Sequence, residues 1–182
     1  TGCAQEDCDT ILAPEWRPAS VLDLGAGPGT ASWAAAAQWP GISCFDMIER
    51  DPQFRSLAVE LAQASGIEAL SKAEIHDCDV TTIGSLQAAD LVIAGYALIE
   101  LPEDRLARVV EQAWLAAGCT LVVIEPGTPV AFERLRRIRS QLVMLGANIL
   151  APCPGNGKCP MQAPDWCHFS RRLSRNRLHM HA

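Results

Sequence analysis

The sequence has no uninterrupted apolar run near the ~18 residues that a membrane-spanning helix needs, so we expect no membrane segment. It also has no internal repeat and no low-complexity tract. Hydrophobic residues make up 49% of the chain, which is too many for an intrinsically disordered protein. At roughly 150 residues per domain, 182 residues predict about one globular domain. Because the sequence opens at Thr1 without a methionine, we expect a fragment of a longer chain.

Basic side chains are too few to balance the acidic ones, and the net charge of −6 by itself argues against a nucleic-acid partner. Their distribution is uneven. Residues 132–182 carry nine Lys or Arg and two acids, whereas the rest of the chain carries six Lys or Arg and nineteen acids. This polarity predicts an anionic partner for the basic part. The alternative is that the arginines only solvate one face of a helix.

Short β-rich apolar runs alternate with helical stretches along the chain, which predicts a mostly parallel sheet covered by helices on both faces. The predicted strands are Ser20–Leu24, Ile42–Ile48, Glu74–Asp77, Leu91–Ala97 and Thr120–Glu125, with a last strand at Asn148–Ala151. The predicted helices are Thr30–Gln38, Pro52–Ala64, Glu103–Ala117 and Pro129–Leu145. We therefore divide the chain into a lead-in segment (1–17), an α/β domain (18–150) and a Cys-rich, basic C-terminal segment (151–182).

Three alternating glycines follow the first predicted strand directly. Gly25, Gly27 and Gly29 come after Asp23, at the point where a strand gives way to a helix. Glycine lets the backbone turn sharply and approach a ligand closely, and a helix N-terminus offers free N–H groups. The spacing Gly-x-Gly-x-Gly differs from the Gly-x-Gly-x-x-Gly of dinucleotide-binding proteins. It resembles the first motif of Rossmann-like S-adenosylmethionine-dependent methyltransferases, with an NAD-type or non-catalytic nucleotide-binding turn as the alternative.

Acidic residues follow the second and third predicted strands. Glu49 is our candidate for the ribose hydroxyls, with Asp51 as the alternative, because one carboxylate can accept from two vicinal hydroxyls. In methyltransferases of this class an acid after the third strand commonly binds the adenine amino group, which makes Asp77 or Asp79 a candidate. The alternative for both positions is a solvated acidic turn.

The end of the fourth predicted strand is where substrate-facing residues are expected. Gly95-Tyr96-Ala97-Leu98 stands there, in place of the Asn-Pro-Pro-Tyr that is typical of methyltransferases acting on amino groups. Tyr96 is the one candidate for a catalytic position, and it could stack on a base or simply pack. The sequence therefore leaves the catalytic residues undefined.

The chain has eight cysteines, and five of them fall into two groups. Cys44 and Cys119 lie in apolar runs and are expected to be buried as small hydrophobic residues. Cys153, Cys159 and Cys167 lie within fifteen residues, among prolines and glycines that can fix turns around a metal. Three thiolates favour zinc or an iron–sulfur cluster, and the alternative is three unligated thiols. His168 directly follows a cysteine, and adjacent residues rarely reach the same ion.

Four segments together resemble the small-ribosomal-subunit methyltransferase-like family, whose members include mitochondrial ribosome assembly factors and bacterial relatives. They are Asp23–Thr30, Glu125–Thr128, Ala151–Pro154 and Trp166–Phe169, and the resemblance extends from about Pro18 to Arg175. It implies a Rossmann-like class I methyltransferase fold, S-adenosyl-L-methionine as cofactor, an iron–sulfur cluster of the four-iron type rather than zinc, and binding to small-subunit ribosomal RNA.

The chain departs from this family in two respects. The fourth cluster cysteine of the family lies downstream of the Trp-Cys-His-Phe segment, whereas no cysteine follows Cys167 here. Either that ligand is missing, or Cys3, Cys8 or a histidine replaces it. The last antiparallel strand of the fold is also not evident. Both differences are expected of a chain truncated at its C-terminus.

The basic C-terminal part supplies the candidate contacts to ribosomal RNA phosphates. These candidates are Arg134, Arg136, Arg137, Arg139, Arg171 and Arg172. On the predicted helix Arg136 and Arg139 share a face, whereas Arg137 points elsewhere. Two functions stay open: a methyltransferase, and a non-catalytic RNA-binding assembly factor with a vestigial cofactor pocket. We expect the bacterial cytoplasm, with the mitochondrial matrix as the alternative.

Overall fold

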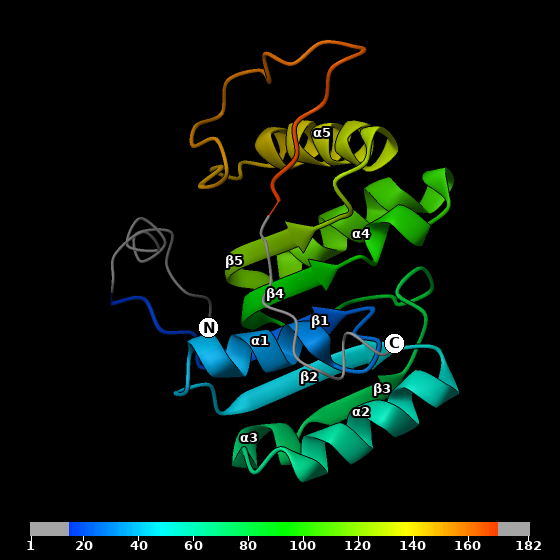
Figure 1. Ribbon diagram of the computed structural model, residues 1–182, viewed down its shortest axis with the longest axis vertical. Helices are drawn as coiled ribbons and strands as arrows, with labels where there is room; N and C mark the ends of the chain where they lie inside the picture. Colours follow the sequence, from blue (N-terminus) through cyan, green and yellow to red (C-terminus); the bar gives the residue numbers. More distant parts are fainter. Residues whose placement is uncertain (1–14, 171–182) are drawn as a thin grey trace.

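The computed structural model of the chain describes residues 15–170, in which five parallel strands form one sheet with the order β3-β2-β1-β4-β5 (Figure 1). The strands are β1 (Ser20–Leu24), β2 (Cys44–Glu49), β3 (Glu74–Asp77), β4 (Ala89–Gly95) and β5 (Ala117–Ile124). The chain winds outward from β1 to β3 and then returns to place β4 on the other side of β1. Ligands of such sheets bind at the carboxyl ends of the strands beside this reversal.

Helices cover both faces of the sheet (Figure 1). On one face lie α1 (Thr30–Gln38), α2 (Pro52–Ala64) and α3 (Glu68–Ser71); on the other lie α4 (Glu103–Ala116) and α5 (Pro129–Met144), and the turn η2 (Leu98–Glu100) precedes α4. Both α2 and α5 begin with a capping side chain followed by proline, the start that the sequence predicts. The Rossmann-like α/β fold predicted from the sequence is confirmed.

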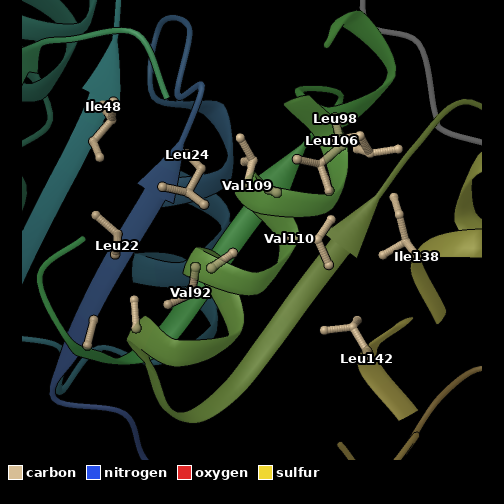
Figure 2. Packing of buried hydrophobic residues seen from close by; sticks show 14 of the residues in the cluster. Leu22, Leu24, Ile48, Val92, Leu98, Leu106, Val109, Val110, Ile138 and Leu142 are labelled. Carbon is tan, nitrogen blue, oxygen red and sulfur yellow. The ribbon is translucent and has the colours of Figure 1, made fainter. Parts of the chain in front are cut away.

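The core between the sheet and α4 and α5 is built mainly from aliphatic side chains (Figure 2). Leu22 and Val92 of the sheet pack there with Val109 and Val110 of α4 and Ile138 of α5. Neighbouring positions of β1 point alternately to the two faces, so a strand buried on both sides is apolar almost without interruption. Asp23 is the one buried polar residue of β1. None of the described helices is both long and apolar enough to cross a membrane.

Two predictions about elements are wrong. Residues 148–151 form no strand, because the backbone of Ile149 is used inside a turn: its N–H donates to Asn156 Oδ1 at 3.1 Å, and its carbonyl accepts from Gly155 N at 2.8 Å. Of the two cysteines expected to be buried, Cys44 is exposed, because it is the first residue of β2, and Cys119 is half-buried. The one-turn helix α3, which buries Leu70, was not predicted.

Candidate cofactor site

The glycine loop lies at the carboxyl end of β1, and all three of its glycines adopt positive φ angles that side chains disfavour: +66° at Gly25, +55° at Gly27 and +86° at Gly29. A Cβ on Gly25 would approach Ala97 Cβ to 2.7 Å, so this glycine lets the loop contact the segment after β4. A Cβ on Gly27 would meet no atom within 4 Å. The backbone at Gly27 is therefore open to a ligand.

Glu49 ties the glycine loop to the end of β2. Its Oε2 accepts from Gly27 N at 2.8 Å and its Oε1 accepts from Asp51 N at 2.7 Å, and the residue is buried. Each carboxylate oxygen can accept a further hydrogen bond. This arrangement fits the proposed role of Glu49 toward two vicinal hydroxyls.

Asp23 lies inside the fold at the base of the glycine loop. Its Oδ2 accepts from both the backbone N–H of Ser32 (3.1 Å) and the Ser32 hydroxyl (2.8 Å), which fixes α1 against β1. Burial raises the pKa of Asp23 to about 6, although the bonds from Ser32 act in the opposite direction. Asp23 therefore supports the loop from within, and Ser32 is a supporting residue that the sequence analysis missed.

The other acidic candidates have partners of their own at the carboxyl edge. Asp51 is exposed and caps α2, accepting from Gln53 N and Phe54 N. Asp77 is exposed and pairs with Arg55 at 2.8 Å.

Asp79 accepts from Thr81 N at 2.8 Å, and this bond, followed by the weaker pairing with Arg50 at 3.4 Å, lowers the pKa of its carboxyl. β2 and β3 are neighbours in the sheet, so the topology brings the acids after them to the edge where Glu49 lies. The choice between Asp77 and Asp79 for adenine stays a prediction.

The segment after β4 has a strained backbone. Tyr96 is the one non-glycine residue of the described chain with a positive φ, +59°, and its side chain is 59% exposed. Its N–H donates to Ile124 O at 2.8 Å, which holds it in this conformation. A bulky residue held in a strained conformation beside a candidate ligand site is typical of functional positions.

Glu125 at the end of β5 is a buried residue whose structural importance the sequence analysis did not anticipate. Its Oε1 accepts from Leu98 N at 2.8 Å and from Ile99 N at 3.1 Å, so it holds the turn η2 in place. Its Oε2 is buried and accepts no hydrogen bond from the part of the chain that the structure describes. Burial raises the pKa of this carboxyl. Its place as the last residue of the predicted strand Thr120–Glu125 was the available signal.

A cavity of about 600 Å³ lies along β2 and β3 and is not lined by any of the three loop glycines. Its lining includes Leu22, Ile48, residues 75–78 with Asp77, and Ile83. Asp46 and His76 also line it, with a hydrogen bond of 3.0 Å between His76 Nε2 and Asp46 Oδ1. With Glu74, these two form the one group of three possible metal ligands within 4.8 Å of one another in residues 15–170. The cross-strand pair accounts for their proximity without an ion.

The predicted metal ligands lie on the cysteine loop, residues 151–170, which contains no helix or strand. Cys153 is exposed, whereas Cys159 and Cys167 are half-buried; all three are free thiols, and their sulfur atoms do not all lie within 4.8 Å of one another. The segment around Cys167 packs on the end of β5: Trp166 Nε1 donates to Gly127 O at 3.3 Å. The loop therefore lies at the edge of the sheet that carries Glu125.

The structure corrects the prediction that Arg134 contacts RNA. This residue is 7% exposed, and its Nη1 donates to the carbonyls of Leu98, Ile99 and Leu101 while its Nη2 pairs with Glu103 at 2.7 Å. Its guanidinium therefore has no free face for a phosphate.

The other described arginines of α5 are more accessible. Arg137 pairs with Glu103, whereas Arg136 and Arg139 donate to the cysteine loop, so the predicted division of these three between two faces is confirmed. Arg171 and Arg172, like Cys3 and Cys8, lie outside the described residues.

Solved structures of methyltransferases share this fold. The plantazolicin methyltransferase BpumL, solved with a desmethyl-plantazolicin analogue and S-adenosylhomocysteine, superposes with a TM-score of 0.52 at 17% identity, covering 68% of this chain and 44% of BpumL. A Methanococcus maripaludis protein assigned to the S-adenosylmethionine-dependent methyltransferases gives 0.51 at 18% identity, covering 75% of this chain and 60% of that protein. These likenesses concern the fold alone.

Curated relatives are longer mitochondrial proteins. The human ribosome assembly protein METTL17 is 27% identical over 174 residues, which are 87% of this chain and 37% of METTL17. The Schizosaccharomyces pombe Rsm22-cox11 tandem protein 2 is 25% identical over 158 residues, 78% of this chain and 21% of that protein. The chain thus spans about a third or less of these relatives. Residues 8–182 match the family model described as mitochondrial small ribosomal subunit Rsm22, and the chain therefore belongs to the Rsm22 family.

Proposed function

We propose that this chain binds S-adenosyl-L-methionine in its glycine loop and takes part in assembly of the small ribosomal subunit, in contact with ribosomal RNA. One observation supports cofactor binding most directly: the backbone of Gly27 is open to a ligand and lies directly beside the carboxylate of Glu49. The family and the name of the human relative, a ribosome assembly protein, support the ribosomal partner. The relatives are mitochondrial, which favours the mitochondrial matrix over the bacterial cytoplasm.

The chain's own residues would hold the cofactor in a defined way. The glycine loop lets the backbone lie against the ligand, Glu49 accepts from the ribose hydroxyls, and Asp79 or Asp77 accepts from the adenine amino group. Asp51 holds the start of α2 beside Glu49. When bound, S-adenosyl-L-methionine supplies a methyl group on a positively charged sulfur. Tyr96 would face the acceptor.

Three thiolates suit an iron–sulfur cluster, or zinc, and Cys153, Cys159 and Cys167 would supply them. The fourth ligand is not among the described cysteines of the loop. We assign the cluster a structural role, because the loop that bears the thiols has no regular secondary structure of its own. Such a loop depends on its ligands and on its contacts with α5 and β5.

The second candidate function is a non-catalytic assembly factor that retains the pocket. The segment Gly95-Tyr96-Ala97-Leu98 favours it, since it lacks the polar groups that position an amino acceptor. Both candidates use the same fold and the same basic C-terminal part for RNA binding. They differ only in whether methylated RNA is formed.

Methyl transfer from radiolabelled S-adenosyl-L-methionine to small-subunit RNA separates the two. An enzyme labels the RNA, and Gly27→Asn, which weakens cofactor binding, strongly reduces the label at limiting S-adenosyl-L-methionine while RNA binding persists. A non-catalytic factor gives no labelled product with either protein but binds RNA equally with both. A wild-type chain that does not bind small-subunit RNA would contradict both candidates.

A further inference from the structure

Two arginines of α5 hold the cysteine loop by its backbone. Arg139 Nη2 donates to Gly155 O at 2.7 Å, and Gly155 is two residues after Cys153. Arg136 Nη1 donates to Met161 O at 3.0 Å, and this carbonyl is two residues after the second cysteine of the loop. Each guanidinium thus fixes the backbone close to a predicted metal ligand.

The third cysteine is held in a corresponding way from β5. Trp166, the residue before Cys167, donates its indole N–H to Gly127 O at 3.3 Å. A Cβ on Gly127 would lie 3.1 Å from His168 Cβ, so the Trp-Cys-His segment lies directly on this glycine. All three cysteines of the loop therefore have an anchor within two residues.

The neighbouring arginines of α5 contact other parts of the molecule. Arg137 directs both Nη atoms to Glu103, at 3.0 and 3.1 Å, and does not contact the loop. Arg136 and Arg139 are three residues apart and so lie on one face of the helix. That face brings positive charge to a loop whose thiols would become anionic thiolates on binding a metal.

We propose that Arg136 and Arg139 are positioning residues for the metal site: they hold the backbone of the cysteine loop on α5. They also place positive charge beside the loop, of which Arg136 shares its part with Glu133 at 3.0 Å. This inference rests on the proposed function, because it takes the three thiols to be metal ligands. Groups that orient metal ligands commonly contribute about 10- to 100-fold to metal affinity.

The test uses full-length protein reconstituted anaerobically with iron and sulfide. Arg136→Gln, Arg139→Gln and the double variant are compared with Arg137→Gln, which removes the same charge from the same helix without touching the loop. Iron and sulfide content, the rate of cluster loss to a chelator, and hydrogen exchange of residues 153–167 are measured. Trp166→Phe, which removes only the indole donor, tests the third anchor independently.

We expect the double variant to lose its cluster about tenfold faster than wild type, with faster exchange in the loop, while Arg137→Gln behaves as wild type. Unchanged binding of S-adenosylhomocysteine and an unchanged circular dichroism spectrum verify that the fold is intact. A double variant that keeps its cluster as long as Arg137→Gln overturns the inference and leaves the proposed function standing. A wild-type chain that takes up no iron and sulfide overturns the metal part of the proposed function, and the inference with it.

Discussion

At the scale of single residues, Asp23 combines a buried carboxyl group with two hydrogen bonds from Ser32. Its pKa is about 6 in the fold and 3.8 in the unfolded chain, so the folded state binds the proton more tightly. Its contribution to stability is therefore largest below pH 4 and falls as the pH rises from 4 through 6, by roughly 3 kcal/mol. Asp23→Asn removes this loss and keeps an oxygen acceptor for Ser32.

We expect urea denaturation to give wild type and Asp23→Asn free energies of unfolding that diverge between pH 4 and 6, with the variant more stable at pH 7. The difference between the two proteins isolates this carboxyl from other titrating groups. Parallel stability curves across that range would mean that Asp23 ionises without cost.

Glu125 stabilises a turn through one oxygen. Because Oε1 accepts from Leu98 N and Ile99 N, Glu125→Ala leaves two N–H groups unpaired and should lower the free energy of unfolding by about 2 kcal/mol. Glu125→Gln keeps the acceptor and loses the charge that burial disfavours, so it should lie close to wild type at pH 7. Equal destabilisation of both variants would show that the charge, and not the acceptor, is what the turn requires.

At the scale of elements, Arg134 links α5 to the start of α4. It donates to three carbonyls around η2, and without it these groups lose their donor. Arg134→Ala should therefore destabilise the fold by about 3 kcal/mol or more. Arg137→Ala, one turn further on, removes a solvent-exposed pair and should change the denaturation midpoint little. A wild-type midpoint for Arg134→Ala would contradict this structural role.

The elements that could be predicted are those with local signals. Asp51-Pro52 and Thr128-Pro129 mark the starts of α2 and α5 in the sequence, and both helices begin there. Residues 148–151 resembled a strand by composition, but the side chain of Asn156 captures the N–H of Ile149, a contact that no local pattern specifies.

Within the site, the glycines follow the first predicted strand and Glu49 follows the second. This order was sufficient to predict that the glycine loop and Glu49 lie together. The burial of Arg134 was recognisable in principle, since it shares the helical stripe of Ala131, Ile138 and Leu142. Its positive charge instead favoured the prediction that it contacts RNA phosphates. The anchors of the cysteine loop depend on tertiary contacts and could not be predicted from spacing.

At the scale of the whole molecule, the basic C-terminal part should dominate RNA binding. Phosphate contacts release counterions, so affinity for small-subunit RNA should fall steeply between 50 and 200 mM salt, by about a factor of ten or more for a few contacts. Filter binding across this range measures the slope. Arg137→Gln should lower the slope of log affinity against log salt by the amount expected for about one lost phosphate contact. Arg134→Lys should leave this slope unchanged, because position 134 is buried. An affinity independent of salt would contradict a phosphate-binding surface.

The central claim is that the glycine loop holds an adenosyl ligand, and calorimetric titration with S-adenosylhomocysteine tests it most directly. Gly27 and Gly66 have similar left-handed backbones, +55° and +69°, and a Cβ at either meets no atom within 4 Å, but only Gly27 lies in the loop. Asparagine tolerates this conformation, so Gly27→Asn and Gly66→Asn form a matched pair. We predict that wild type and Gly66→Asn bind alike and that Gly27→Asn binds at least about tenfold more weakly, ~1.4 kcal/mol. Absence of binding to wild type, or equal binding by both variants, would contradict the account.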